Sequence, residues 1–239
     1  MNAIIELTKF LLKRNSEIAK MKHLETQEIV SGIYAIKTKN ANFYVVKNDD
    51  NCIAIDAGGS NENIVKTELY KLNIEPEKIT AVLLTHTDFD HISALSLFKN
   101  AAIYISKQEE QVIDGSVPRL VFGGKNKFNY NYSTIEDNEE LRFGKIKVKS
   151  VLTPGHTVGS MSFLIDDKYL FVGDNLSLQN GQVGLFNSLF NFNDDTQKES
   201  IRNLAKIAST EYIFTAHYGF TDKPKEAFKN FAIEEKSND

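Results

Sequence analysis

Two histidines and two aspartates fall within six residues, directly after a short apolar segment. The segment, residues 79–85, is rich in β-branched and aliphatic side chains, which predicts a buried strand. The six residues that follow, His86-Thr87-Asp88-Phe89-Asp90-His91, would form the loop that leaves this strand. Because a strand end is rigid, side chains on such a loop can converge on one point. Imidazole and carboxylate groups bind divalent transition metals, so the loop is a predicted metal site.

The other histidines and one more aspartate also follow predicted strands. The chain contains only five histidines, so their placement is informative. We interpret His23 as an ordinary core residue, the usual role of a single histidine on an apolar face. The remaining candidates come after strands in order along the chain: His156 after residues 145–152, Asp174 after 169–172 and His217 after 212–214.

The order of these motifs resembles the metallo-β-lactamase superfamily over about residues 30–220. The first motif of that family is H-x-H-x-D-H, followed by an isolated histidine, a bridging aspartate and a last histidine. Residues 153–160, TPGHTVGS, are similar to the version in glyoxalase II and related thioester hydrolases, and residues 171–174, FVGD, look like that group's aspartate motif. Residues 55–59, IDAGG, resemble the early Asp-Gly turn. The family is functionally broad, so the resemblance is specific only for fold and metal chemistry.

The resemblance implies an α/β fold, an αββα sandwich of two mixed β-sheets with helices on the outer faces. The metal site would lie at one edge, where the loops after the strands meet. Two divalent metal ions are implied, with zinc expected. One would be bound by His86, Asp88 and His156, the other by Asp90, His91 and His217, and Asp174 would bridge them. Asp90 would also accept a proton from the attacking water, which makes it the predicted catalytic residue.

Asp56 lies in the early turn of the motif series. In the family an aspartate in this turn hydrogen-bonds the ligand loop and orients a histidine without binding metal itself. The same residue could instead form an Asx turn before Gly58 and Gly59. The two roles are compatible.

Asp88 departs from the family pattern, because it stands where the second histidine of the first motif is usual. It adds one negative charge, which would make bound water less acidic and the site more tolerant of iron or manganese. Acidic residues do occur at this position in the superfamily, for example glutamate in the flavodiiron oxidoreductases. The alternative is that Asp88 is not a ligand and that a single metal is bound.

The function predicted from this ligand set is metal-dependent hydrolysis, in which a metal-bridging hydroxide cleaves a small ester, thioester, lactone or related acyl bond. The alternatives are a diiron-type redox enzyme acting on oxygen or persulfide, a phosphodiester hydrolase, and a non-catalytic binding protein. Only 22 residues follow His217, enough for one helix, which argues against a glutathione-thioester enzyme of the usual kind. The substrate-binding residues are unknown from the sequence. Aromatic residues of two long loops could form a wall for the substrate: Tyr130, Tyr132, Phe186, Phe190 and Phe192.

Composition indicates a soluble protein, and the predicted hydrolysis implies a small-molecule substrate. The chain has 239 residues, 41% hydrophobic and 25% charged, as expected for one globular domain. A net charge of −4 gives no general attraction to nucleic acid. The single cysteine, Cys52, cannot form an internal disulfide, and we expect a cytoplasmic location. No transmembrane segment is expected.

The first residues form a separate element in this interpretation. Residues 1–25 predict an amphipathic helix that packs on the body or on a second subunit, and the second arrangement would make the protein a homodimer. Residues 26–239 predict a single metallo-β-lactamase-like domain. Within it we expect antiparallel strands at 32–38, 42–47 and 52–55, and a helix at 61–72 with Ser60 as its N-cap. Further helices are expected from residue 92, at 196–207 and at 224–235, with a long loop over 176–195.

Overall fold

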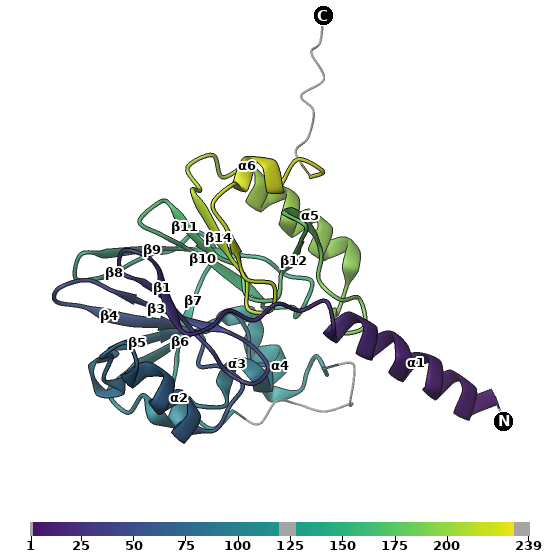
Figure 1. Cartoon of the computed structure of the whole chain (residues 1–239), viewed down its shortest axis with the longest axis horizontal. Helices are drawn as coiled ribbons and strands as arrows, with labels where there is room; N and C mark the ends of the chain where they lie inside the picture. Colours follow the sequence, from purple (N-terminus) through teal and green to yellow (C-terminus); the bar gives the residue numbers. More distant parts are fainter. Residues whose placement is uncertain (1, 120–127, 232–239) are drawn as a thin grey trace, which may run out of the picture.

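Two β-sheets pack face to face in the computed structural model, which describes residues 2–119 and 128–231 (Figure 1). The first sheet has the order β1-β2-β3-β4-β5-β6-β7 and the second the order β15-β14-β11-β10-β9-β8. The strands of the first sheet are β1 Gln27–Val30, β2 Ile33–Ile36, β3 Phe43–Lys47, β4 Cys52–Ile55, β5 Ala81–Leu83, β6 Ala102–Ser106 and β7 Ser133–Ile135. Those of the second are β8 Glu140–Phe143, β9 Ile146–Leu152, β10 Met161–Ile165, β11 Tyr169–Phe171, β14 Tyr212–Phe214 and β15 Phe220–Thr221.

Both sheets are mixed, because each combines hairpins with parallel pairs. Strands β1 to β4 are antiparallel neighbours, as the sequence predicted for 32–55, whereas β4 to β7 run parallel. In the second sheet only β11 and β14 are parallel. Parallel neighbours end at the same edge of a sheet, so the loops that follow β4, β5, β11 and β14 can meet there.

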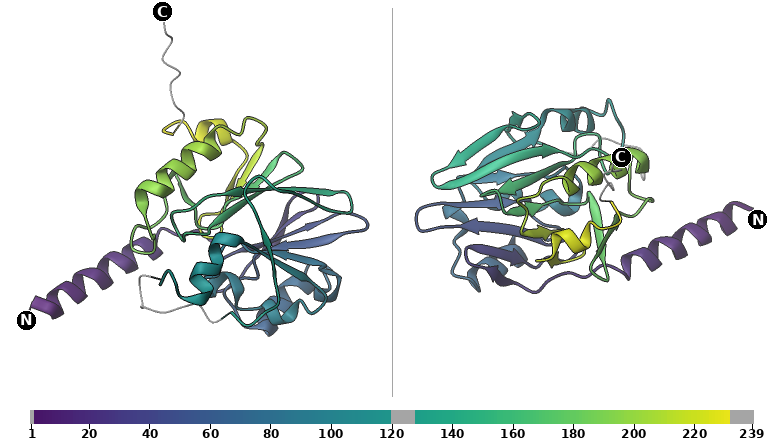
Figure 2. Two further views of the ribbon diagram at one scale, coloured as in Figure 1. Left: turned by 180° about the vertical axis from the view of Figure 1, so that it is seen from behind. Right: turned by 90° about the horizontal axis from the view of Figure 1, so that it is seen from above.

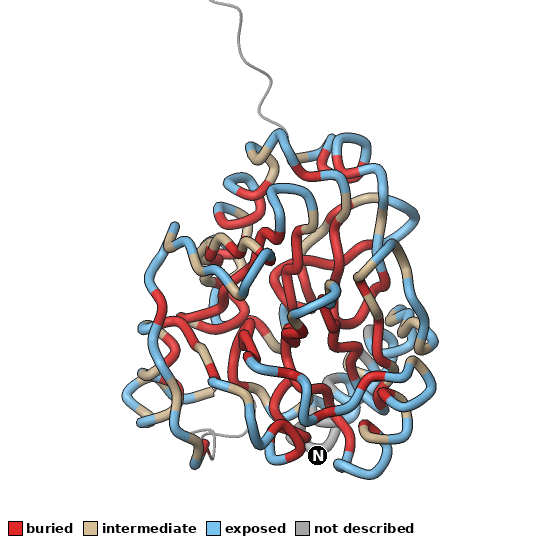
Figure 3. The backbone as a smooth tube through the Cα atoms, turned by 90° about the vertical axis from the view of Figure 1, so that its left-hand side faces the viewer, coloured by how far each residue is buried: buried red, intermediate tan, exposed pale blue. Residues whose placement is uncertain are grey.

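The main core lies between the sheets, where strand residues alternate between two faces. In β2, Ile33 and Ala35 face the second sheet, and Ile36 contributes to the opposite face. From the second sheet, Phe163 and Phe214 complete this inner core, and both are fully buried. Figure 3 shows that buried residues gather in the middle of the molecule, whereas exposed residues lie mostly around its outside.

Helices cover the two outer faces. Helix α2, Glu62–Tyr70, buries Val65 and Leu69 against the first sheet, and α5, Asp194–Ala205, buries Ile201 and Leu204 against the second. The views in Figure 2 agree that these helices lie on opposite sides of the sheets. The fold is therefore an α/β αββα sandwich, and this prediction is confirmed.

The remaining elements are short. The hairpin β12–β13 forms a third, two-stranded sheet. The other helices and this hairpin have the following bounds: η1 Pro76–Lys78, α3 Phe89–Ile92, η2 Leu95–Leu97, η3 Lys107–Glu109, α4 Glu110–Asp114, β12 Leu176–Gln179, β13 Gln182–Leu185 and α6 Pro224–Ala227.

Several local predictions were wrong. The N-cap of α2 is Asn61, whose side chain accepts from the backbone N–H of Ile64, while the Ser60 hydroxyl accepts from Lys39. The expected loop over 176–195 contains the hairpin, since turn residues at 180–181 separate two short apolar runs. The helix expected from residue 92 is instead the single turn of α3, ending at Ile92. The helix expected at 224–235 ends at Ala227, and residues 232–235 lie outside the described part of the chain.

The N-terminal helix α1, Asn2–Ile18, projects from the body (Figures 1 and 2). The helix expected over residues 1–25 ends at Ile18, and Arg14 and Ile18 near its C-terminal end line a cavity of the body. Packing of the rest of the helix, on the body or on a second subunit, remains a prediction. The following segment is tied to the body, because the Lys22 N–H donates to the His217 carbonyl at 2.7 Å. Among the described residues, no helix combines the length and apolarity needed to cross a membrane.

Candidate metal centre

Strand ends from both sheets bring the predicted ligands together. His86 follows β5, Asp88 is the N-cap of α3, and the turn of α3 carries Asp90 and His91. The other three come from the second sheet: His156 lies between β9 and β10, Asp174 follows β11 and His217 follows β14. The predicted ligands thus lie far apart in sequence and converge at one edge of the sandwich.

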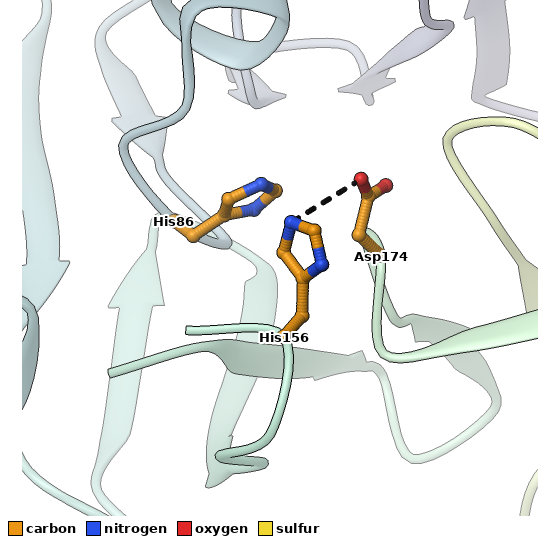
Figure 4. A group of neighbouring side chains, drawn as sticks. All are labelled: His86, His156 and Asp174. Atoms are coloured by element: carbon orange, nitrogen blue, oxygen red, sulfur yellow. Dashed lines mark ion pairs between the residues drawn. The ribbon is translucent and has the colours of Figure 1, made fainter. Parts of the chain in front are cut away.

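His86, His156 and Asp174 form one group of donor atoms (Figure 4). Nε2 of His156 lies 3.5 Å from Oδ2 of Asp174, and the imidazole rings of His86 and His156 have centroids 4.6 Å apart. Asp88 lies beside this group, since its Oδ2 is 3.2 Å from Nε2 of His156 and 3.7 Å from Nε2 of His86. Such separations suit donors that share one ion.

Asp90, His91 and His217 form the second group. Nε2 of His217 is 3.4 Å from Oδ2 of Asp90 and 3.2 Å from Oδ1 of Asp174. The same Oδ1 lies 3.4 Å from Nε2 of His91. Asp174 therefore offers one carboxylate oxygen to each group, which is the arrangement of a bridging ligand.

Hydrogen bonds at Nδ1 direct the other ring nitrogen of each histidine toward the centre. The Asp56 carboxylate accepts from Nδ1 of His91 at 2.8 Å and from the Thr85 hydroxyl at 2.9 Å. Because that hydroxyl has one hydrogen, it must accept from Nδ1 of His86, 3.0 Å away. The contact predicted between Asp56 and the ligand loop is present, and Asp56 adopts φ 65° to make it. That Asp56 orients His91 toward a bound metal ion remains a proposal.

The two remaining histidines are oriented in the same manner. Nδ1 of His156 lies 3.3 Å from Oδ1 of Asn191. Nδ1 of His217 lies 3.4 Å from Nε2 of His23, whose ring packs against it. His23 is therefore not simply a core residue, as the sequence suggested, but a neighbour of a candidate ligand.

Orphaned buried atoms show that the donor set fits a divalent cation. Among the described residues, Nε2 of His86, Nε2 of His91 and Oδ1 of Asp174 are buried without a hydrogen-bond partner. Leaving such atoms unsatisfied costs about 1–3 kcal/mol each. All three face the same centre, and nitrogen and carboxylate oxygen are donors that zinc accepts.

Charge is concentrated at this centre. Burial alone would lower the pKa of His91, but the carboxylates of Asp174 and Asp56 raise it well above its usual range. Burial would raise the pKa of Asp174, yet His217 and His91 hold it well below the ordinary value. A carboxylate that stays ionised inside a protein needs such compensation, and a metal ion would supply it.

Two glycines allow the ligand loops to approach each other. Gly173 precedes Asp174 with φ 53°, and a Cβ there would lie 2.5 Å from the Thr85 hydroxyl oxygen. Gly155 precedes His156 with φ 141°, and its Cβ would lie 2.4 Å from that of Gln197. Only glycine fits both conformations without displacing the loops.

A buried glutamate joins two of the ligand loops. Oε1 of Glu109 accepts from the backbone and hydroxyl of Thr87, both at 2.8 Å, and Oε2 accepts from the Thr157 hydroxyl at 2.6 Å. Thr87 follows His86 and Thr157 follows His156, so one side chain sets the spacing of both loops. The sequence analysis did not identify Glu109, because nothing in its helical segment marks it as buried.

We expect Glu109→Gln to change how stability depends on pH. Burial raises the pKa of Glu109 to about 7, so stability is lost as pH rises from about 4.5, its ordinary value, through 7. Glutamine cannot ionise, so the variant should gain on the order of 3 kcal/mol relative to wild type between pH 4.5 and pH 8. Urea unfolding of the metal-free proteins at pH 5 and pH 8 measures this. An equal difference in unfolding free energy at the two pH values would contradict it.

Arg119 is a second residue that the sequence analysis missed. It lies in the loop after α4, and its guanidinium group pairs with the Asp88 carboxylate. Nε donates to Oδ1 at 2.8 Å and Nη2 donates to Oδ2 at 2.5 Å. The signal available in the sequence was the acidic substitution itself, since an additional buried carboxylate calls for a cation somewhere in the chain.

A cavity of about 310 Å³ opens over the two groups. Phe186 and Phe190 form part of its wall, and Arg14 and Lys39 bring positive charge to it. Of the aromatic residues considered as a substrate wall, Tyr130 and Tyr132 pack instead with Phe128 against the outer core of the first sheet. Phe192 is exposed and is not among the lining residues described.

The sandwich and its edge cluster of histidine and aspartate define a metal-dependent hydrolase. The chain belongs to the metallo-β-lactamase superfamily, whose family model matches residues 37–217. A probable metallo-hydrolase of Methanocaldococcus jannaschii is 32% identical over 164 residues, which cover 69% of each chain. A hydroxyacylglutathione hydrolase of Dictyostelium discoideum is 26% identical, covering 78% of this chain and 74% of that protein. In fold, the chain is similar to a metallo-β-lactamase superfamily protein of Sulfolobus tokodaii, with a TM-score of 0.61, 24% identity and 84% coverage of both chains.

Proposed function

We propose that this protein hydrolyses a small ester, thioester or related acyl bond with two divalent metal ions, zinc being the expected metal. The observation that carries the proposal is the pair of donor groups that share Asp174 beneath a cavity with an apolar wall. Metal ions in such a site supply hydroxide at neutral pH and polarise a carbonyl oxygen. The similarity to a hydroxyacylglutathione hydrolase, a thioester hydrolase by name, supports acyl chemistry.

The residues around the metal site would have different roles in the proposed hydrolysis. Asp90 is the most exposed of the three candidate carboxylate ligands, with 26% of its side chain exposed against 19% for Asp88 and 4% for Asp174, and it lines the cavity. It can therefore accept a proton from water at the cavity floor. His91 is fully buried and is not among the residues described as lining the cavity, so its role would be to hold the site rigid. Asp174 is almost fully buried at the base of the cavity, where it would bridge the two metal ions. Phe186, which packs edge-on against the His156 ring, would exclude water from the acyl group.

Charge at the cavity supports a substrate with an anionic end. Lys39 is exposed at the cavity and Arg14 reaches it from α1, while the metal ligands lie at its base. A carboxylate or phosphate on the substrate would meet these two cations while its acyl group rests on Phe186 and Phe190. This arrangement favours anionic thioesters or esters over neutral ones.

We expect metal-replete protein to turn over acyl thioesters or esters and to prefer anionic ones. The experiment is a parallel screen of thioesters, esters, lactones and phosphodiesters, each as an anionic and a neutral analogue. Lys39→Met should raise KM for the anionic analogue a few-fold, the range of an exposed ion pair, and leave kcat unchanged. Turnover of phosphodiesters alone, or oxygen-dependent turnover with bound iron, would reject the acyl-hydrolase proposal.

A further inference from the structure

Asp88 is held by a guanidinium group that is itself fixed on several sides. Besides its two bonds to the Asp88 carboxylate, Arg119 donates from Nη1 to the His156 carbonyl at 2.7 Å and from Nη2 to the Phe190 carbonyl at 3.0 Å. The side chains of both partners are largely buried, with 15% of Arg119 and 19% of Asp88 exposed. A forked arginine–carboxylate pair with this much support has one geometry.

The pair leaves Asp88 able to bind a metal. Two donors that share a tetrahedral zinc, each about 2.0–2.1 Å from it, are about 3.3 Å apart. Oδ2 of Asp88 lies 3.2 Å from Nε2 of His156 and 3.7 Å from Nε2 of His86, close to that spacing. A carboxylate oxygen has two lone pairs, so the hydrogen bond from Arg119 does not by itself prevent Oδ2 of Asp88 from binding an ion.

Arg119 does not occupy the Nε2 lone pair of His156 that a metal ion would need. Nη2 carries two hydrogens, and Asp88 and the Phe190 carbonyl accept them at 2.5 and 3.0 Å. Its 3.3 Å approach to Nε2 of His156 is therefore close contact rather than a required hydrogen bond. Arg119 is also not among the residues described as lining the cavity, which argues against a direct contact with substrate.

The net charge of the Asp88–Arg119 pair equals that of a neutral histidine, the residue that is usual at position 88 in the family. A neutral histidine ligand contributes no charge, whereas Asp88 alone contributes −1. Arginine is always protonated in proteins, so Arg119 returns the local total to zero. The lower site charge expected from Asp88 in the sequence is thus offset by a residue 31 positions away.

We propose that Asp88 and Arg119 act as one neutral unit in place of a histidine: Asp88 binds the metal shared with His86 and His156, and Arg119 orients and neutralises it. Arg119 is then a positioning residue for metal affinity. The proposal rests on the metal site of the proposed function. It adds that the affinity of that site depends on a residue outside the ligand set.

A double-mutant cycle tests the pair through zinc affinity. Arg119→Met is made in the wild-type chain and in an Asp88→His chain, with Arg142→Met, an exposed arginine on β8, as the matched control. Metal-free protein is titrated with zinc against a chelating competitor, and the cobalt-substituted absorption spectrum reports ligand geometry. In the wild-type chain we expect the weaker of two zinc affinities to fall about 10- to 100-fold, as for partners of metal ligands. In the Asp88→His chain the same change should have no effect or should strengthen binding.

A conservative variant separates charge from shape. Arg119→Lys keeps the charge but loses the two-bond fork, so its zinc affinity should lie between those of wild type and Arg119→Met. Thermal unfolding of each metal-free protein shows whether the fold is retained. If the methionine variant misfolds, the lysine variant in the two chains provides the comparison.

Three results would overturn the proposal. Tighter zinc binding by Arg119→Met in the wild-type chain would show that the guanidinium competes with the metal. Equal losses in both chains would show that Arg119 only packs the loop. An unchanged zinc affinity and cobalt spectrum would show that Arg119 does not act on the site. Because no substrate is used, wild-type protein that binds zinc and hydrolyses nothing would reject the proposed function and leave the pair intact.

Discussion

Asp90→Asn is expected to lower hydrolytic turnover by roughly 100-fold or more. The substitution keeps the size of the side chain but removes its charge and its ability to accept a proton. General-base catalysis contributes about 10²–10⁴-fold, and Asp90 is the candidate base that lines the cavity next to His217. The measurement is kcat in metal-replete protein with the metal content determined on the same sample.

The metal content decides how this result is interpreted. Loss of turnover with both ions retained supports proton transfer by Asp90, whereas loss together with one ion shows that Asp90 acts mainly as a ligand. Asp195→Asn is the matched control, because 92% of that side chain is exposed on α5. Near-normal turnover of Asp90→Asn with both ions bound would show that Asp90 is not the base.

Removal of metal is expected to abolish hydrolysis and to lower stability strongly. Seven candidate ligands exceed what one ion needs, so we expect two ions per chain in metal-replete protein. An ion at 1,000 times its Kd stabilises the folded state by about 4.1 kcal/mol, and in a chain of this size each kcal/mol shifts Tm by about 2–4 °C. Chelation should therefore lower Tm by about 8–16 °C for each such site.

Elemental analysis and thermal unfolding, before and after chelation, measure these effects. Zinc added back should restore both Tm and activity, and magnesium at the same concentration serves as the control for ionic strength. A stoichiometry near one in metal-replete protein, or a Tm that does not change on chelation, would count against two metal ions.

The sequence predicted the fold and the family because the signals for both are local. Short β-branched runs end at polar loops, and such runs become buried strands in almost any packing arrangement. Elements marked by weak or competing signals were missed. The hairpin β12–β13 was taken for a loop, and the helix at residue 92 proved to be the single turn of α3, which ends within the ligand loop.

The candidate ligands could be named from the sequence because their residue types are rare and their order is distinctive. The residues that contact these ligands could not be named from the sequence. Asn191, Glu109 and Arg119 reach the site from segments whose sequences carry no motif, and His23 is brought against His217 by a backbone hydrogen bond at Lys22. These contacts depend on how separate loops pack, and no local pattern records that.

By itself, the sequence determined the sandwich, the strand ends from which ligands project and the excess of acid at Asp88. Only the tertiary structure decided how that excess is compensated, because the balancing charge of Arg119 is supplied across space by a loop 31 residues away. Local propensity acts over a few residues, whereas electrostatic balance in a buried site is set by whichever charges the fold brings within hydrogen-bonding distance.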